Sequence, residues 1–226
     1  MKSQTILVWD IPTRLFHWLL AGNFALAYIT AEAEGWENVH YTAGFTLLGL
    51  IAFRLAWGVI GSRYARFSQF AYSPAQVLTY MKHMRHQRHL GHNPLGSMAV
   101  FGLIGLGLLT SLAGTLMFVT GWEWPEEPHE LLANLMLLLV CAHIVGVIIS
   151  GKLHGENLTR AMVTGLKKGQ PLDAIKSDHR LVATLLLAAL LSFWAYASTH
   201  PFATARLEVE AKSDAGVETR KDDEEE

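Results

Sequence analysis

The chain has 226 residues, 51% of them hydrophobic and only 17% charged, and its formal net charge is −2. The charged fraction lies well below the roughly 25% of soluble globular domains, which excludes an ordinary soluble domain. A single cysteine, Cys141, excludes a disulfide framework, and we expect no nucleic-acid partner.

Five apolar blocks follow one another along the chain, each long enough, or nearly so, to cross a bilayer as a helix. They span residues 15–31, 40–60, 97–118, 131–151 and 181–197. A crossing helix needs about 20 mostly apolar residues, and these blocks are apolar nearly all round rather than on one face. We therefore predict an all-α integral membrane bundle with five transmembrane helices.

The same blocks indicate how the chain is divided. Residues 1–180 are expected to form a four-helix membrane domain, and residues 181–203 a fifth transmembrane helix. The remaining segment, 204–226, ends in KDDEEE and lacks aromatic residues, so we predict an acidic disordered tail.

Basic residues are distributed unevenly among the connecting segments. Lys and Arg occur before the first block, between the second and third, and between the fourth and fifth. The two remaining loops, EAEGWEN (32–38) and GWEWPEEPHE (121–130), contain neither. Because cytoplasmic loops carry an excess of Lys and Arg, we expect a cytoplasmic N-terminus and a C-terminal tail on the opposite side.

Four of the eleven histidines lie in or at the ends of the blocks, where an imidazole is costly and normally has a partner or a function. His17 lies near the cytoplasmic end of the first block, and His40 begins the second block on the other side. His129 stands at the outer end of the fourth. His143 follows fourteen residues later, about 21 Å further in and on the same helix face. Depth therefore sorts them into an outer pair, His40 and His129, and an inner pair, His17 and His143.

Imidazoles about 21 Å apart cannot bind one metal ion, because metal–nitrogen bonds are only about 2 Å long. Each could instead supply one axial ligand to a separate haem iron, with the opposite ligand on another helix. The chain has no Cys-x-x-Cys-His site, so such haems would be held non-covalently. Gly44, Gly49 and Gly146 would admit a flat macrocycle, and Arg54, at the inner depth, could pair with a haem propionate.

Simpler interpretations exist for each residue taken singly. A histidine at a helix end more often snorkels or caps, and Arg54 could reach towards the headgroups. Glycines in membrane helices more often serve close packing, which we prefer for Gly102, Gly105 and Gly107. Two depth-matched pairs from independent helices favour ligation.

The opening VWDIPTRLFHWLLA resembles the bacterial cytochrome b561 family, which includes the b-type cytochrome subunits of nickel–iron hydrogenases. The resemblance continues through HYTAGFTLLGLIAFRLAWGVIGSRYARF, GHNPLGSMAV and the segment beginning HELLANLMLLLVCAHIVG, covering roughly residues 7–170. It implies a four-helix core with two non-covalent b haems, and His17, His40, His129 and His143 fall where the ligand histidines of the family fall. It assigns no role to the fifth helix or the tail.

This resemblance implies electron transfer in the bacterial inner membrane, between the quinone pool and a periplasmic c-type cytochrome or oxidoreductase subunit, with no catalytic residue in the chain. Glu123, Glu126 and Glu127 could dock a basic partner, although we prefer to explain them as ordinary solvated charge. One alternative is a self-contained quinone-linked oxidoreductase of a small species such as superoxide. Another is a haem-free membrane transporter whose histidines bind metal or protons.

The other histidines receive separate interpretations. His83, His86 and His89 lie in a basic stretch beginning at Ser73-Pro74, which could suggest a metal site but more readily forms a helix on the anionic inner leaflet. His154, eleven residues beyond His143, is a reserve ligand. Three more are assigned to a turn or to the membrane interface: His92, His179 and His200.

Overall fold

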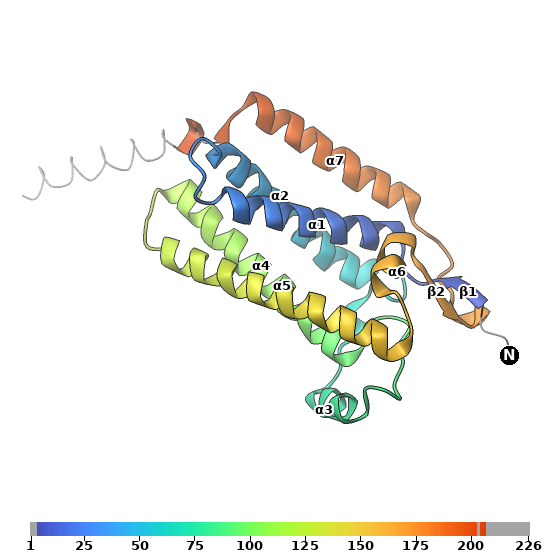
Figure 1. The fold of residues 1–226 in the computed structure, drawn as a ribbon. Helices are drawn as coiled ribbons and strands as arrows, with labels where there is room; N and C mark the ends of the chain where they lie inside the picture. The colour runs from blue at the N-terminus through green and yellow to red at the C-terminus, as the bar shows by residue number, and fades with distance from the viewer. Residues whose placement is uncertain (1–3, 203, 207–226) are drawn as a thin grey trace, which may run out of the picture.

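The computed structural model of the protein describes residues 4–202 and 204–206. Helices dominate the described part (Figure 1). In chain order the elements are β1 (Gln4–Leu7), α1 (Ile11–Thr30), α2 (Glu37–Ile60), η1 (Phe67–Gln69), α3 (Pro74–His83), α4 (Pro94–Thr120), α5 (Glu126–His154), α6 (Leu158–Thr164), β2 (Leu166–Gly169), η2 (Pro171–Asp173) and α7 (Arg180–Thr199). The predicted disordered tail lies outside the described residues, apart from 204–206.

The long helices confirm an all-α membrane bundle. Four helices of the described part are long and apolar enough to cross a membrane, namely α2, α4, α5 and α7. The first expected crossing, α1, has 20 residues but is not among these four. It carries Arg14, His17 and Asn23, which lower its hydropathy, and it packs along α2.

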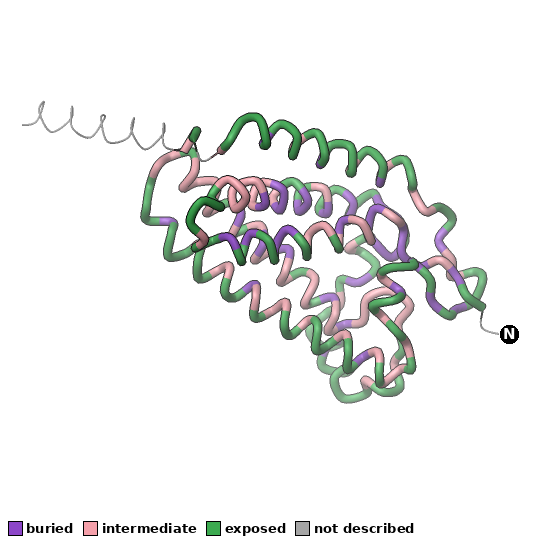
Figure 2. The backbone as a smooth tube through the Cα atoms, turned by 45° about the horizontal axis from the view of Figure 1, so that its top comes forward, coloured by how far each residue is buried: buried purple, intermediate pink, exposed green. Residues whose placement is uncertain are grey.

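Two helical hairpins form the bundle. The α1–α2 hairpin packs on the α4–α5 hairpin through α2 and α4, and α7 lies along α1 and α2, away from α4 and α5 (Figure 1). Burial is concentrated on α1 and α2, whereas α5 and α7 are mostly exposed (Figure 2). The exposed side chains of α5 and α7 include Leu138, Ile149 and Leu185, which a hydrocarbon layer would solvate.

An apolar cluster fills the middle of the bundle, and we call it the mid-bundle cluster. Its buried members come from α1, α2 and α5: Phe24, Ala27, Ala43, Leu47 and Met136. Met136 lies seven residues, or about two turns, from both His129 and His143. The cluster therefore separates the outer histidine pair from the inner pair.

The end of the bundle that carries β1, β2, α3 and α6 is termed the basic end (Figure 1). Strand β1 pairs antiparallel with β2, from Gln4 opposite Gly169 to Leu7 opposite Leu166. A second cluster packs beneath this pair, and it consists of Ile6, Val8, Trp9, Tyr64, Ala161 and Ile175. The opposite, acidic end contains the 31–36 and 121–125 connections. Neither strand was expected from the sequence, because each has only four residues.

Asp10 explains why the Trp-Asp-x-Pro segment begins a helix. Its Oδ1 accepts a hydrogen bond from the Thr13 backbone N–H at 2.7 Å, which caps α1, and Pro12 occupies the first turn. Its Oδ2 accepts from Trp57 Nε1 at 3.2 Å, near the end of α2. Asp10 is fully buried, so one carboxylate fixes the start of α1 against the end of α2.

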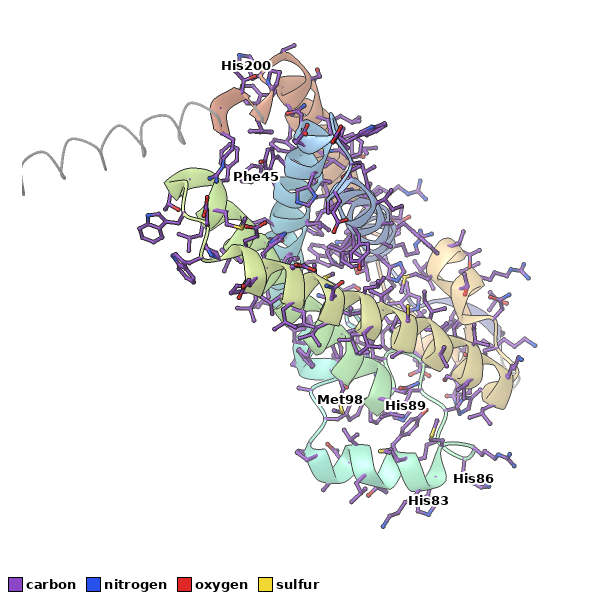
Figure 3. The ribbon with its side chains drawn as sticks, turned by 60° about the vertical axis from the view of Figure 1, so that its left-hand side comes forward. Phe45, His83, His86, His89, Met98 and His200 are labelled. Atoms are coloured by element: carbon purple, nitrogen blue, oxygen red, sulfur yellow. The ribbon has the colours of Figure 1, made fainter. Side chains whose placement is uncertain are left out.

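The basic stretch with three histidines is only partly helical. Ser73 and Gln76 form a capping box at the start of α3, but the helix ends at His83. His86 follows in a turn, and His89 lies between α3 and the bundle, while His83 and His86 lie on the outer side (Figure 3). The prediction of one helix carrying all three histidines was therefore wrong. No group of three metal-ligating side chains occurs in the described residues.

Candidate functional site

The first turns of α2 and α5 bring His40 and His129 together at the acidic end. Their ring centres are 6.2 Å apart and their planes are inclined by 72°. Two metal–nitrogen bonds of about 2 Å each, plus about 1 Å from each nitrogen to its ring centre, add up to about 6 Å. The separation of these two rings therefore matches that of two axial ligands on one iron.

Both imidazoles of this outer pair are fixed by backbone carbonyl groups. His40 Nδ1 donates to the Ala27 carbonyl at 2.9 Å, and His129 Nδ1 donates to the Thr110 carbonyl at 2.9 Å. Because a carbonyl only accepts, Nδ1 must carry the proton, which leaves the lone pair of Nε2 available. Metal-ligating histidines usually make a bond of this kind through their second nitrogen.

Glycines make room beside this pair. A Cβ added to Gly114 of α4 would stand 2.9 Å from His129 Cε1, so only glycine fits against that ring. A Cβ on Gly44, one turn beyond His40, would meet nothing within 4 Å. Open space of this kind is what a flat macrocycle needs. The role of Gly114 was not expected from the sequence.

The inner pair, His17 on α1 and His143 on α5, is brought close enough to interact electrostatically. Both rings are half-buried. His17 Nδ1 is buried and has no hydrogen-bond partner among the described residues, unlike the Nδ1 atoms of the outer pair. A Cβ on Gly146, one turn beyond His143, would also meet open space.

Arg54 of α2 is buried inside the protein. Its side chain is 3% exposed, and its guanidinium carbon lies 4.6 Å from the centre of the Phe67 ring. Its Nη1 is buried without a hydrogen-bond partner in the described part of the chain. The guanidinium is therefore enclosed by protein side chains, and its pairing with a propionate stays a prediction.

His92, which was expected from the sequence only to lie in a turn, also belongs to this region. It precedes α4, and its ring lies between Trp9, with centres 4.9 Å apart, and Phe70, with centres 4.3 Å apart. Burial, followed by the fields of Arg54, His143 and His17, lowers the pKa of His92 to about 3, so the imidazole is neutral. The only sequence signal was the GHNP segment of the family resemblance.

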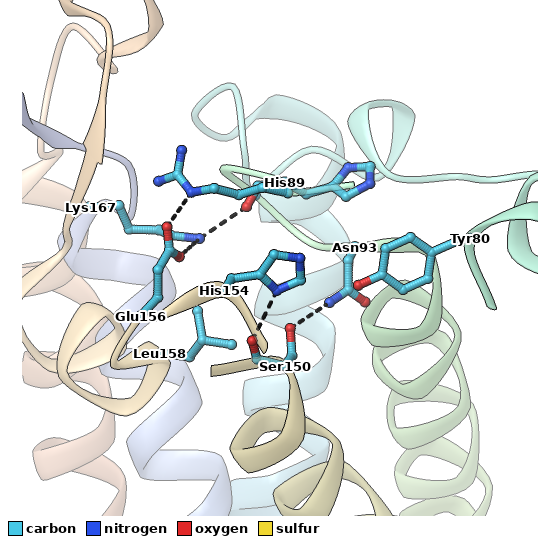
Figure 4. Close-up of a pocket in the computed structure, with 10 residues that line it drawn as sticks. Tyr80, His89, Asn93, Ser150, His154, Glu156, Leu158 and Lys167 are labelled. Atoms are coloured by element: carbon cyan, nitrogen blue, oxygen red, sulfur yellow. Dashed lines mark hydrogen bonds and ion pairs between the residues drawn. The ribbon is translucent and has the colours of Figure 1, made fainter. Parts of the chain in front are cut away.

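The reserve ligand, His154, lies in a separate polar pocket at the basic end (Figure 4). Its Nδ1 donates to the Ser150 carbonyl at 2.9 Å. In the same pocket Glu156 forms ion pairs with Lys167, at 3.0 Å, and with Arg88. The pocket brings together α3, α5 and β2, which are distant in sequence.

The last two histidines flank α7 and make aromatic contacts. His179 has a left-handed backbone with φ of 53° and meets the Trp57 ring edge-on at 5.1 Å. His200 stacks on Tyr196 at 4.4 Å. The interfacial positions expected from the sequence stay predictions.

The fold and these pairs define a class of protein: a multi-pass helical membrane protein with paired imidazoles on either side of an apolar core. The model of the prokaryotic cytochrome b561 family matches residues 8–165, which is more than half of the chain. The chain therefore belongs to that family, as its sequence predicted. It is a membrane electron-transfer protein of a family that binds b-type haem. No curated protein and no solved structure matches the chain.

Proposed function

We propose that the chain holds two b haems and carries electrons across the bacterial inner membrane between the quinone pool and a periplasmic redox partner. In this proposal His40 and His129 are the axial ligands near the acidic end, and His17 and His143 those near the basic end. The partner would be a c-type cytochrome or a subunit of an oxidoreductase complex, such as a hydrogenase.

One observation carries the proposal. The ring centres of His40 and His129 are separated by 6.2 Å, and both Nδ1 atoms donate to backbone carbonyls. A pair that merely capped two helices would not need this separation, nor the same tautomer on both rings. The arrangement leaves two Nε2 lone pairs for one metal.

The inner pair and the core between the pairs support the same proposal. His17 Nδ1 is buried without a partner, and the helix turn after His143 borders open space at Gly146. When bound, each haem would supply a reversible one-electron couple. The mid-bundle cluster would exclude water between the two positions, and the imidazoles would fix their depth.

The charge distribution supports an orientation and a kind of partner. The basic end carries the Lys and Arg residues of the long connections, which favours the cytoplasmic side. At the acidic end Glu123, Glu126 and Glu127 are exposed. An exposed acidic surface there would favour a partner with a basic face.

The test is the haem content of the purified chain, measured as haem b per polypeptide together with a reduced-minus-oxidised spectrum. We expect about two haems in the wild type, and the loss of one in each single alanine variant of the four histidines. His40→Ala combined with His129→Ala should lose no more haem than either alone, whereas His40→Ala combined with His17→Ala should lose both. The exposed His83 provides a control, since His83→Ala should keep the full complement.

Three outcomes would contradict the proposal: a wild type without haem, a single haem per chain, or additive losses within a pair. The route is tested separately in vesicles containing the protein. Quinol in the bilayer should reduce the haems, and an external basic c-type cytochrome should reoxidise them. Failure of either reaction would remove that partner from the proposal while leaving the haem assignment intact.

A further inference from the structure

Arg54 and His92 lie together near the inner pair, although one belongs to α2 and the other precedes α4. Both contact Phe70: the Arg54 guanidinium carbon lies 5.9 Å from its ring centre, and the His92 ring centre lies 4.3 Å away. Arg54 Nη1 and His92 Nδ1 are both buried without a hydrogen-bond partner in the described part of the chain. Two potential N–H donors of this region thus lack an acceptor.

Buried polar groups in native proteins nearly always have partners, so two neighbouring exceptions call for an explanation. A guanidinium is always charged and prefers a carboxylate or a phosphate. The Asp10 carboxylate influences Arg54 electrostatically, but its two oxygens already accept from Thr13 N and Trp57 Nε1. Among the described residues neither Arg54 Nη1 nor His92 Nδ1 has a hydrogen-bond partner, so an added anion would satisfy both groups.

We propose that Arg54 and His92 jointly bind a propionate of the haem held by His17 and His143, with His92 as a neutral N–H donor beside the charged guanidinium. The inference rests on the proposed function. A propionate is costly in hydrocarbon and is expected to point towards the membrane surface. His92 occupies that direction, because it lies in the connection before α4, at the basic end.

The contacts of His92 suit a donor better than an axial ligand. Trp9 and Phe70 hold the ring on two sides, with centres 4.9 and 4.3 Å away. The ring is thereby fixed, and Nδ1 is the nitrogen that remains buried and unpartnered. His92 is thus a positioning residue, and Trp9, from the Trp-Asp-x-Pro segment, links the start of α1 to the inner site.

Two substitutions of His92 distinguish its role as a hydrogen-bond donor from its role in packing between Trp9 and Phe70. His92→Phe keeps an aromatic ring between Trp9 and Phe70 but removes the N–H, whereas His92→Gln keeps an N–H donor and loses the ring. His86→Leu is the matched control, because His86 is an exposed histidine in the same connection. The variants are made in the full-length chain with its haems, and each is examined for haem per polypeptide and by redox titration of each haem.

His92→Phe should retain both haems and lower the midpoint potential of one, because a less neutralised carboxylate stabilises ferric iron. The potential of the other haem should not move. His92→Gln should lie nearer the wild type, and His86→Leu should match it.

Two results would overturn the inference. One is unchanged potentials in His92→Phe with both haems present. The other is loss of one haem in both His92 variants, as in His17→Ala, which would make His92 an axial ligand or a structural requirement. Failure of the proposed function would show in a different measurement: the wild type would lack two haems, or His17→Ala would keep both.

Discussion

Gly114 of α4 lies against the imidazole of His129 on α5, and a Cβ at position 114 would stand only 2.9 Å from His129 Cε1. The Nδ1 of the same imidazole donates to the Thr110 carbonyl, one turn earlier on α4. One turn of α4 therefore fixes both the position and the tautomer of His129.

We predict that Gly114→Ala displaces His129 and lowers the haem content from about two per chain towards one. Alanine is the better helix former by about 1 kcal/mol, so a loss cannot be attributed to a weaker helix. Gly105→Ala is the matched control on the same helix, because its Cβ would meet nothing within 4 Å. An unchanged haem content and spectrum in Gly114→Ala would show that His129 can move without consequence.

Asp10 provides a second prediction, on stability. Asp10→Ala removes the cap of α1 and the acceptor of Trp57 Nε1, and should lower the free energy of unfolding by about 2–3 kcal/mol. Asp10→Asn has one oxygen instead of two, so it can cap α1 but not also accept from Trp57. The melting temperature of Asp10→Asn should therefore approach that of Trp57→Phe. If the effects of Asp10→Asn and Trp57→Phe on the melting temperature are fully additive in the double variant, the hydrogen bond between Asp10 and Trp57 contributes nothing to stability.

The ion pair of Glu156 should make stability depend on pH. Burial opposes ionisation of Glu156, but Lys167 and Arg88 outweigh it, so the pKa of Glu156 is lowered. Because the carboxylate is favoured in the folded state, its contribution is present above the pKa of the unfolded chain. That contribution is lost as the pH falls through the depressed folded pKa.

Glu156→Gln should therefore destabilise the protein most near neutral pH, by about 2 kcal/mol, since it leaves Lys167 buried without a counter-charge. This loss of stability is smaller than that expected for a fully buried ion pair, because the side chains of Arg88 and Glu156 are partly exposed to solvent. Thermal unfolding of both proteins at several pH values measures the difference, which should shrink in acid. A difference independent of pH would assign the effect to packing, and Lys167→Met in the Glu156→Gln background should restore part of the stability.

The contact of α7 with the bundle gives a fourth prediction. Trp194 Nε1 donates to Thr46 Oγ1 at 2.9 Å and joins α7 to α2. Trp194→Phe should lower the free energy of unfolding by about 1 kcal/mol and leave the haem content unchanged, because α7 packs on the side of α1 and α2 away from α5. Loss of a haem in this variant would show that α7 supports a ligand helix directly.

Much of the fold could be predicted because its signals are local. Apolar length placed the long helices, and Ser73-Pro74 placed the start of α3. The family was recognised from contiguous segments. The two strands of four residues, the end of α3 at His83 and the lower hydropathy of α1 were not anticipated, since short elements leave little periodicity and tertiary contacts decide where they end.

The candidate site also has a part that local sequence signals predict and a part that depends on tertiary contacts. Helical rise and face placed His129 and His143 at two depths, and the structure brings each near its expected partner. The ligand assignment itself stays a prediction. His92 could not be placed from sequence because its neighbours, Trp9 and Phe70, come from separate segments. The carbonyl partners of His40 and His129 likewise depend on how neighbouring helices are rotated, which sequence does not state.

The mid-bundle cluster has an electrical consequence. It separates two histidine pairs whose depths differ by about 21 Å, in a hydrocarbon layer about 30 Å thick. An electron passing between them would cross about two-thirds of the membrane voltage, which at 100 mV corresponds to about 1.5 kcal/mol. If each pair holds a haem as proposed, the proportion of the two haems that is reduced would therefore shift with the membrane potential, without any movement of the protein.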